Sequence, residues 1–318
     1  MKATVIHHSA DYDGIFCREI ARKFLPEAQL IGWHFGDPAI PVPSDKGPIY
    51  VMDLPVDQVF GFSYPLSMNV SDFGNQTAIQ IMERLIWIDH HKSSIDTHPK
   101  DIPGYRIDGV AACRMAWQWF AHLQGFSKAG TVGVLPMMDE LPDIFDFKNR
   151  RVVEPLAVRL AGEYDVWDHR DNDVDVAFQF GLDSQYGIDW EKLFRDDFDV
   201  PLYVEKIVVA GRMAMQCYAK RDADVMRTRS FLTGFEGFRF LCLNTAKCSS
   251  NTFSALDVEA TGHDALLAFY WTGKDWSVSM YHAAHRKELD LSEIAKRYGG
   301  GGHRGACGFL AKTLPFVQ

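Results

Sequence analysis

Short apolar runs recur along the first half of the chain, and a polar segment follows each of them. The clearest runs are 3–6, 49–52 and 85–88. Runs of this length that are rich in Val, Ile and Leu and bounded by polar residues predict buried β-strands. Between the strands, apolar residues recur with helical spacing, which predicts amphipathic helices over 15–25, 72–85, 110–123 and 156–161.

Alternation of short strands with helices of this length is typical of the α/β class. It predicts a parallel sheet whose crossover connections are right-handed. The Gly- and Pro-rich stretch 130–142 and the following residues 143–151 do not fit the alternation. We interpret them as an irregular insertion without an assigned place.

The second half of the chain has a different pattern. Residues 203–229 predict one long helix that connects two parts of the chain, and acidic residues cluster before it, at 196–199. Short strands follow over 238–243, 265–271 and 276–281, and then a helix over 291–298. The pattern predicts a larger domain over 1–195, a linker helix over 196–230 and a smaller mixed α/β domain over 231–318.

Composition limits the classes of function. The chain has 318 residues, 47% of them hydrophobic and 24% charged, which is typical of a globular protein and long enough for two domains. The net charge of −9 argues against a protein that binds long duplex nucleic acid over a broad basic face. The acidic excess lies in residues 1–230, which suits a part of the chain that holds cations.

The cysteines and the apolar segments bear on localisation. The six cysteines form no CxxC pair, which predicts free thiols in a reducing compartment. The chain starts directly in a strand-like run without a signal region, and no apolar run approaches the roughly 20 residues of a membrane helix. We expect a cytoplasmic protein without a membrane partner.

Metal-ligating residue types follow the first strand. Asp11 and Asp13 are two residues apart, His7 lies four residues before Asp11, and Gly14 permits a sharp turn. One imidazole with closely spaced carboxylates suits Mn²⁺, Mg²⁺, Co²⁺ or Fe²⁺ better than a zinc site made of thiolates. The alternative is an ordinary loop in which the Asp residues cap the next helix.

The next two predicted strands are also followed by metal-ligating residue types. Asp53 follows the second strand and is the natural bridge between two metal ions. Asp89, His90 and His91 follow the third, and because adjacent side chains at a strand end point in different directions, the two histidines can have different roles. One can bind metal and the other can donate to a substrate phosphate, while Asp89 fixes an imidazole tautomer.

A fourth carboxylate is expected to complete a two-metal site. The segment 163–169 offers Asp165, which we favour, and Asp168 as its rival. The alternative is a surface acidic loop.

The glycine-rich segment 299–308 suggests a second site. Gly300, Gly301 and Gly302 let backbone N–H groups approach an anion, and His303 and Arg304 add donors. A turn or linker would also contain such a run. The polar loop 244–252 is a further candidate for the same cleft, or an ordinary loop.

Taken in order, these motifs resemble the DHH phosphoesterase superfamily, in the subgroup that carries a C-terminal DHHA1 domain. The residues that carry the resemblance are His7, Asp11, Asp13, Gly14, Asp53, Asp89, His90, His91, Asp165, Gly300, Gly301, Gly302, His303, Ala306 and Gly308. The resemblance implies a Rossmann-like parallel-sheet DHH domain, a helical linker and a smaller mixed α/β DHHA1 domain. It also implies two divalent ions of the Mn²⁺ type, with Mg²⁺ or Co²⁺ as alternatives.

The resemblance further implies a role for each residue. His7, Asp11 and Asp53 would hold the first ion, and the second would be held by Asp13, Asp53, His90 and Asp165. His91 would face the scissile phosphate, and Gly300, Gly301, Gly302, His303 and Arg304 would grip a substrate phosphate. Relatives often carry an Arg in the strand before the last helix. This chain has none there, so either Arg286 or His285 substitutes for it or the substrate preference differs.

Within the superfamily, the chain most resembles the nanoRNA-degrading oligoribonucleases. This resemblance implies a phosphodiesterase that cleaves short RNA or linear dinucleotides, with a homodimer as one option for its assembly. The alternatives are a phosphatase for 3′-phosphoadenosine 5′-phosphate, a cyclic-dinucleotide phosphodiesterase, and a catalytically silent nucleotide-binding protein.

Overall fold

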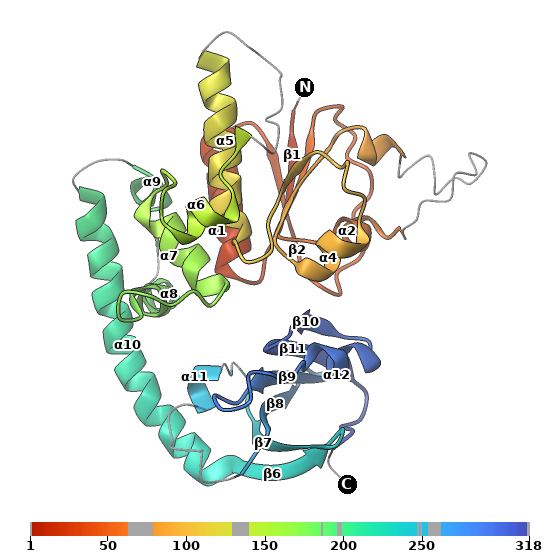
Figure 1. Ribbon diagram of the computed structural model, residues 1–318, viewed down its shortest axis with the longest axis vertical. Coiled ribbons are helices and arrows are strands. Elements are labelled where there is room, and N and C mark those ends of the chain that lie inside the picture. Colours follow the sequence, from red (N-terminus) through yellow and green to blue (C-terminus); the bar gives the residue numbers. More distant parts are fainter. Residues whose placement is uncertain are drawn as a thin grey trace. The chain divides into compact units, whose positions relative to one another are not determined.

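The computed structural model describes residues 2–62, 79–128, 140–185, 187–195, 199–246, 248, 250–253 and 262–316. The chain forms two compact units, Met1–Arg212 and Met213–Gln318, and the boundary falls within the long helix α10, Asp199–Arg229 (Figure 1). Residues 72–78 of the helix expected over 72–85, residues 130–139 of the expected insertion, and Asp196 and Asp197 lie outside the described residues.

The first unit is built on a parallel sheet. Its strands are β1 (Thr4–His8), β2 (Gln29–Trp33), β3 (Ile49–Met52), β4 (Leu85–Asp89) and β5 (Gly104–Arg106). They pair in the order β2-β1-β3-β4-β5, and each pair is parallel, which confirms the predicted α/β class. The strand order reverses between β1 and β3, and the carboxyl ends of strands at such a reversal are where α/β sheets bind ligands.

Helices cover both faces of this sheet. On one face, α1 (Tyr12–Phe24) and α5 (Ala112–Lys128) lie side by side (Figure 1), and Tyr50 of β3 packs against Phe120 of α5 with ring centroids 5.2 Å apart. On the other face, the core joins Ile6 and Val51 to Val59 of α2 (Val56–Phe60). The apolar residues of β1 and β3 therefore alternate between two buried faces.

The remaining helices of the first unit follow β4 and α5 in the sequence. They are α4 (Lys92–Thr97), α6 (Ile144–Lys148), α7 (Leu156–Asp165), α8 (Val174–Ser184) and α9 (Trp190–Leu193). Helix α7 packs on both α1 and α5. The expectation of an irregular segment over 143–151 is wrong, because Asp143 and Asp146 form a capping box that starts α6.

The second unit contains a mixed sheet, which confirms the expected smaller α/β part. Its strands are β6 (Ser230–Phe235), β7 (Phe238–Asn244), β8 (Ala265–Trp271), β9 (Trp276–His282), β10 (Gly301–His303) and β11 (Ala306–Ala311). They pair in the order β10-β11-β9-β8-β7-β6. Among the described pairs of this second sheet, only β7 and β8 are parallel.

Each face of the second sheet has its own core. Helix α12 (Ser292–Arg297) contributes Ile294 to a core with Leu267 and Met280 on one face. On the other face, Met226 of α10 and Phe253 of α11 (Ser250–Phe253) pack against β7 and β8. The C-terminal part of α10 is thus an integral part of the second unit.

The glycine-rich segment is a β-hairpin rather than a loop. Gly301 pairs with Gly308, and Gly302 pairs with Cys307 across β10 and β11. A Cβ on Gly300 would lie 2.0 Å from the carbonyl oxygen of Gly308, and Gly302 has a φ of +126°. Close backbone approach within the hairpin therefore accounts for Gly300 and Gly302, and the predicted contact of this segment with a substrate anion stays a prediction.

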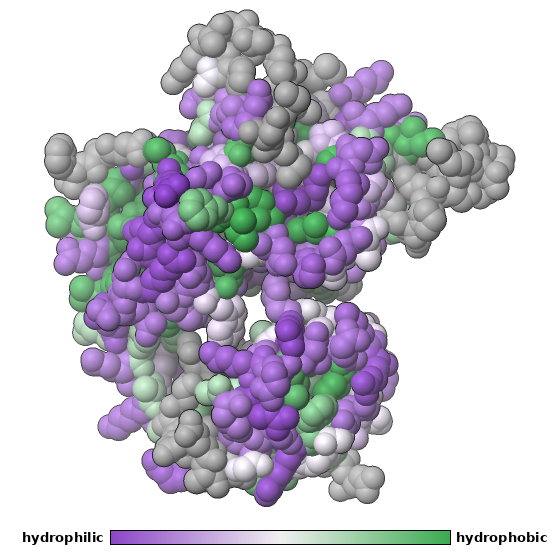
Figure 2. Space-filling model, in the orientation of Figure 1, coloured by the Kyte–Doolittle hydropathy of each residue, from purple (hydrophilic) through white to green (hydrophobic). Residues whose placement is uncertain are grey.

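The face of the molecule drawn in Figure 2 is mostly hydrophilic where its residues are described. In the view of Figure 2, hydrophobic residues form smaller patches between hydrophilic ones. Among the helices in the described part of the chain, none combines the length and the apolar composition needed to cross a membrane.

One contact fixes the start of α1 against the end of β1, and it requires a glycine. Gly14 lies inside α1, and a Cβ there would lie 2.1 Å from the carbonyl oxygen of His8. We therefore expect Gly14→Ala to destabilise the protein by about 3 kcal/mol or more, because the backbone of β1 must move. Urea denaturation of the purified variant measures this loss.

Gly125→Ala is the matched control, since Gly125 lies in α5 and a Cβ there would have open space. We expect this change to be neutral or to stabilise by up to about 1 kcal/mol. Equal stability of the Gly14 variant and the wild type would show that the α1–β1 contact does not constrain the fold.

Candidate metal centre

Carboxylates and imidazoles converge at the carboxyl edge of the parallel sheet, where the strand order reverses. They come from the end of β1, the start of α1, the residue after β3, the end of β4 and the end of α7. Three groups made of described residues of the first unit have potential ligand atoms within 4.8 Å of one another: His8, Asp11 and Asp53; Asp13, His90 and Asp165; and Asp53, Asp89 and His91.

The first group lies at the end of β1. His8 Nδ1 is 2.7 Å from Asp11 Oδ2 and 3.4 Å from Asp53 Oδ2. These distances are short, but the angles between the groups are unsuitable for hydrogen bonds. His8 Nδ1 and Asp53 Oδ2 are therefore buried without a hydrogen-bond partner among the described residues. Buried polar atoms rarely lack a hydrogen-bond partner, and a metal ion held between these atoms would satisfy both of them.

The structure brings His8, not His7, to this group. His7 Nδ1 is instead 2.8 Å from the carbonyl oxygen of His8, and the ring lies beside Gly32 of β2. The prediction of His7 as the ligand is therefore corrected to His8. Side chains alternate along a strand, so His8 follows Ile6 on one face while His7 points to the opposite face. The sequence predicts that the two histidines lie on opposite faces of the strand, but it does not show which of these faces the carboxylates share.

The second group surrounds His90. Its Nε2 is 3.3 Å from Asp53 Oδ1, 3.3 Å from Asp165 Oδ2 and 3.7 Å from Asp13 Oδ2. The structure thus brings together all four residues that the family resemblance assigned to the second ion. Asp13 is fixed in place because its two oxygens accept hydrogen bonds from the backbone N–H groups of Ala112 and Cys113 at the start of α5, at 2.8 and 2.7 Å.

The choice between the two acidic residues near the end of α7 is resolved by position. Asp165 is the last residue of α7 and reaches His90. Asp168 instead accepts hydrogen bonds from Arg170 through both oxygens, at 2.8 and 2.6 Å. Asp165 therefore joins the cluster and Asp168 does not.

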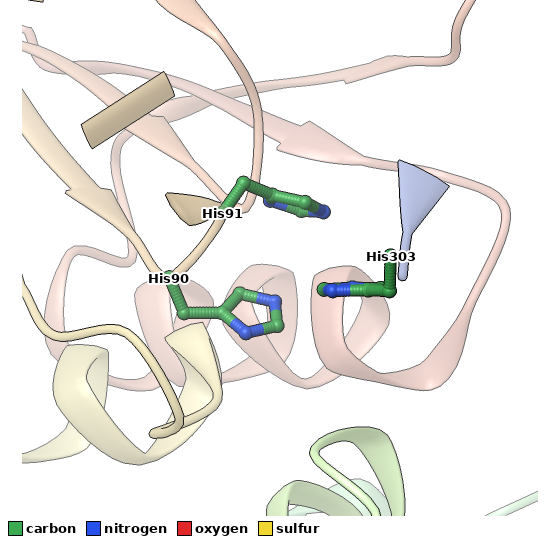
Figure 3. Close-up of side chains that lie close together, drawn as sticks. All are labelled: His90, His91 and His303. Carbon is green, nitrogen blue, oxygen red and sulfur yellow. The ribbon is translucent and has the colours of Figure 1, made fainter. Parts of the chain in front are cut away.

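The third group fixes the orientation of His91. Asp89 is fully buried, and its Oδ1 is 2.8 Å from His91 Nδ1. The same oxygen accepts hydrogen bonds from the backbone N–H groups of His90 and His91. The rings of His90 and His91 extend from consecutive positions after β4, with centroids 4.6 Å apart and planes tilted by 52° (Figure 3). Asp89 thus orients His91, as the sequence predicted for an imidazole at this strand end.

The charges of the cluster are unbalanced without a cation. Burial, and then the carboxylates of Asp53 and Asp165, raise the pKa of Asp13. Burial also raises the pKa of Asp165, to about 7. Burial alone would lower the pKa of His8, but the carboxylates of Asp11 and Asp53 outweigh it and raise that pKa to about 10. A divalent cation bound here would lower the pKa values of these carboxyl groups, because it would neutralise their charge.

The donor set fits two divalent ions. Asp53 has a φ of +59° and directs Oδ2 toward His8 and Oδ1 toward His90, so one carboxylate lies between the two groups. Asp165 Oδ2, like Asp53 Oδ2, is buried without a hydrogen-bond partner in the described part of the structure. Carboxylate oxygens and imidazole nitrogens are ligands suited to Mn²⁺ and related ions.

The expected substrate residues of the second unit lie on and beside its edge hairpin. His303 is the last residue of β10 and is exposed, and Arg304 follows it in the turn. Arg286 contacts Asp264 and places its Nε 2.5 Å from Glu288 Oε1, so its charge is already balanced within the unit. In the polar loop 244–252, Lys247 and Ser249 lie outside the described residues.

Comparison with solved structures finds distant matches. A DHH domain from a member of a ribosomal-protein family is 13% identical, with 98% of this chain and 83% of that chain covered and a TM-score of 0.48. The exonuclease RecJ bound to manganese is 12% identical, with 98% and 86% covered and a TM-score of 0.45. A pGpG-specific phosphodiesterase from Vibrio cholerae is 11% identical, with 98% and 94% covered and a TM-score of 0.40. No protein-family model matches the sequence, and no curated protein is significantly similar to it.

Proposed function

We propose that the protein is a metal-dependent phosphodiesterase of the DHH type that hydrolyses short oligoribonucleotides or linear dinucleotides to mononucleotides. The observation that carries the proposal is the position of Asp53. Its two oxygens face two separate ligand groups, one with His8 and Asp11 and the other with Asp13, His90 and Asp165. A carboxylate shared between two such groups is the arrangement of a two-metal hydrolase.

Each protein group has a task in this reaction. When bound, the two ions would polarise the phosphoryl oxygens and lower the pKa of an attacking water. Asp13, held by the first N–H groups of α5, keeps its oxygens directed into the cluster. Asp89 holds a proton on His91 Nδ1, which fixes the tautomer and aims the other nitrogen of the ring at a substrate phosphate.

The size of the substrate follows from charge. An acidic chain with a net charge of −9 has little attraction for a long polyanion, whereas a small phosphodiester can be held by local contacts. In this proposal, His303 and Arg304 on the hairpin of the second unit hold a terminal phosphate. The Arg304 side chain is 61% exposed, with its Nε 4.0 Å from Asp290 Oδ2 and its guanidinium donating to the carbonyl oxygen of Glu288, so a phosphate would have to compete with these contacts.

A substrate panel tests the proposal. With Mn²⁺ present, we expect the enzyme to cleave a linear dinucleotide and a five-nucleotide RNA, and to lose this activity when EDTA removes the metal. Release of mononucleotides, followed by chromatography, is the measurement. Cleavage of only 3′-phosphoadenosine 5′-phosphate or only cyclic di-AMP would replace the proposed function by one of those activities. Metal-independent binding without turnover would indicate a nucleotide-binding protein.

A pair of variants tests the ligand at the end of β1. We expect His8→Gln to weaken Mn²⁺ binding by about 100-fold or more, beyond the effect of losing an outer-shell partner, because it removes a ligand. The neighbouring change His7→Gln is the control and is expected to leave Mn²⁺ affinity nearly unchanged. Calorimetric titration of Mn²⁺ into each variant measures the difference. The opposite ranking of the two variants would restore His7 as the ligand.

A third change tests the role of Asp89. Asp89→Asn keeps an oxygen for the backbone N–H groups but removes the charge that fixes the His91 tautomer. We expect kcat for the dinucleotide to fall by about 10- to 100-fold. Asp96→Asn, at an exposed residue of α4 that pairs with Lys92, is the control. Equal kcat values for the two variants would argue that Asp89 has no part in orienting His91.

A further inference from the structure

Two aromatic side chains stand beside the metal cluster and are not among its candidate metal ligands. His34 and Phe35 directly follow β2, the neighbour of β1 in the sheet. The His34 ring stacks on the His8 ring, with centroids 5.5 Å apart and planes within 22°, and His34 Nδ1 is hydrogen-bonded to His8 Nε2 at 3.2 Å. Phe35 packs its ring edge-to-face with His8, with centroids 5.6 Å apart. Both residues therefore contact a side chain that is itself 2.7 Å from Asp11.

The loop that carries these rings is fixed. The backbone N–H of His34 donates to Asp37 Oδ2 at 2.8 Å, and the N–H of Asp37 donates back to the carbonyl oxygen of His34 at 2.9 Å. Trp33 Nε1 donates to the carbonyl oxygen of Pro38 at 3.1 Å, and the Trp33 ring packs edge-to-face against Phe35. The two rings are thus held in place before any ligand arrives, which lowers the entropic cost of binding.

The rings also lie at the open side of the cluster. The side chains of Asp13 and Asp53 are almost fully buried, whereas that of Asp11 is 43% exposed. A substrate must approach the cluster from its exposed side, where Asp11 lies. His8 contacts both Asp11 and the aromatic pair, so the pair lies near this side. Phe35 itself is 43% exposed, so a flat ring has room to contact it.

We propose that His34 and Phe35 form a stacking shelf for an aromatic base of the substrate, next to the phosphate held at the metal cluster. The shelf rests on the proposed function for the reaction, and it adds which residues of the first unit contact the nucleobase of the substrate. Every base has a π face, so stacking would favour nucleotides over other phosphoesters without selecting a base sequence.

Binding of small ligands tests the shelf without relying on turnover. With Mn²⁺ present, we expect wild-type protein to bind AMP about 10-fold more tightly than ribose 5-phosphate, within the range that stacking of one base provides. Phe35→Ala should remove this preference by weakening AMP binding about 10-fold while leaving ribose 5-phosphate binding unchanged. Phe35→Trp should keep the preference, because it retains an aromatic face. Calorimetric titration measures all of these affinities.

Phe145→Ala is the matched control, since Phe145 is also an exposed phenylalanine of the first unit but lies on α6. It should bind both ligands as the wild type does. The shelf is refuted if wild-type protein does not prefer AMP, if Phe35→Ala keeps the preference, or if that variant loses affinity for both ligands equally. Failure of the proposed function would appear separately, as absence of dinucleotide hydrolysis by a wild-type protein that still prefers AMP.

Discussion

Buried negative charge around Asp53 is the constraint on which the rest of the candidate centre depends. Asp13 and Asp53 are almost inaccessible to water, and Asp165 ends its helix beside them. Carboxylates this close together are costly to bury unless positive charge accompanies them. The imidazoles of His8, His90 and His91 lie within 3.8 Å of Asp53, and Asp53 Oδ2 and His8 Nδ1 find no hydrogen-bond partner in the described structure. A pair of divalent ions held by these residues would neutralise the buried negative charge.

Backbone groups determine how these side chains point. The Asp11 carboxylate accepts the N–H of Gly14 and so caps α1, Asp13 accepts two N–H groups at the start of α5, and Asp89 accepts two after β4. Each of these carboxylates is thus held by backbone N–H groups, and its remaining lone pairs stay available to the cluster. This arrangement links the fold to the chemistry, because a shift of α1 or α5 relative to the sheet would move the ligands directly. The close contact of Gly14 with His8 limits such a shift.

Several features were predictable because they depend on local pattern. The strand over 265–271 and the strand over 49–52 have the predicted bounds, since a run of apolar residues between polar ends is sufficient to specify a buried strand. Strands β2 and β5 were not predicted, because β2 is partly exposed and β5 has only three residues. The hairpin over the glycine run was also not predicted, because glycine serves equally for an anion site and for close contact between strands, and composition does not distinguish the two uses.

The sequence by itself determined which residue types meet at the end of each strand, and hence that Asp and His would gather at one edge of a parallel sheet. The tertiary structure alone decided which of the two adjacent histidines takes part, and it agreed with the sequence in favouring Asp165 over Asp168. His8 and Asp165 enter the cluster because strand alternation and the end of α7 orient them inward. It also decided what lies beside the cluster. The contact of His34 and Phe35 with His8 arises from the pairing of β1 with β2, between residues more than 20 positions apart, which no local pattern in the chain encodes.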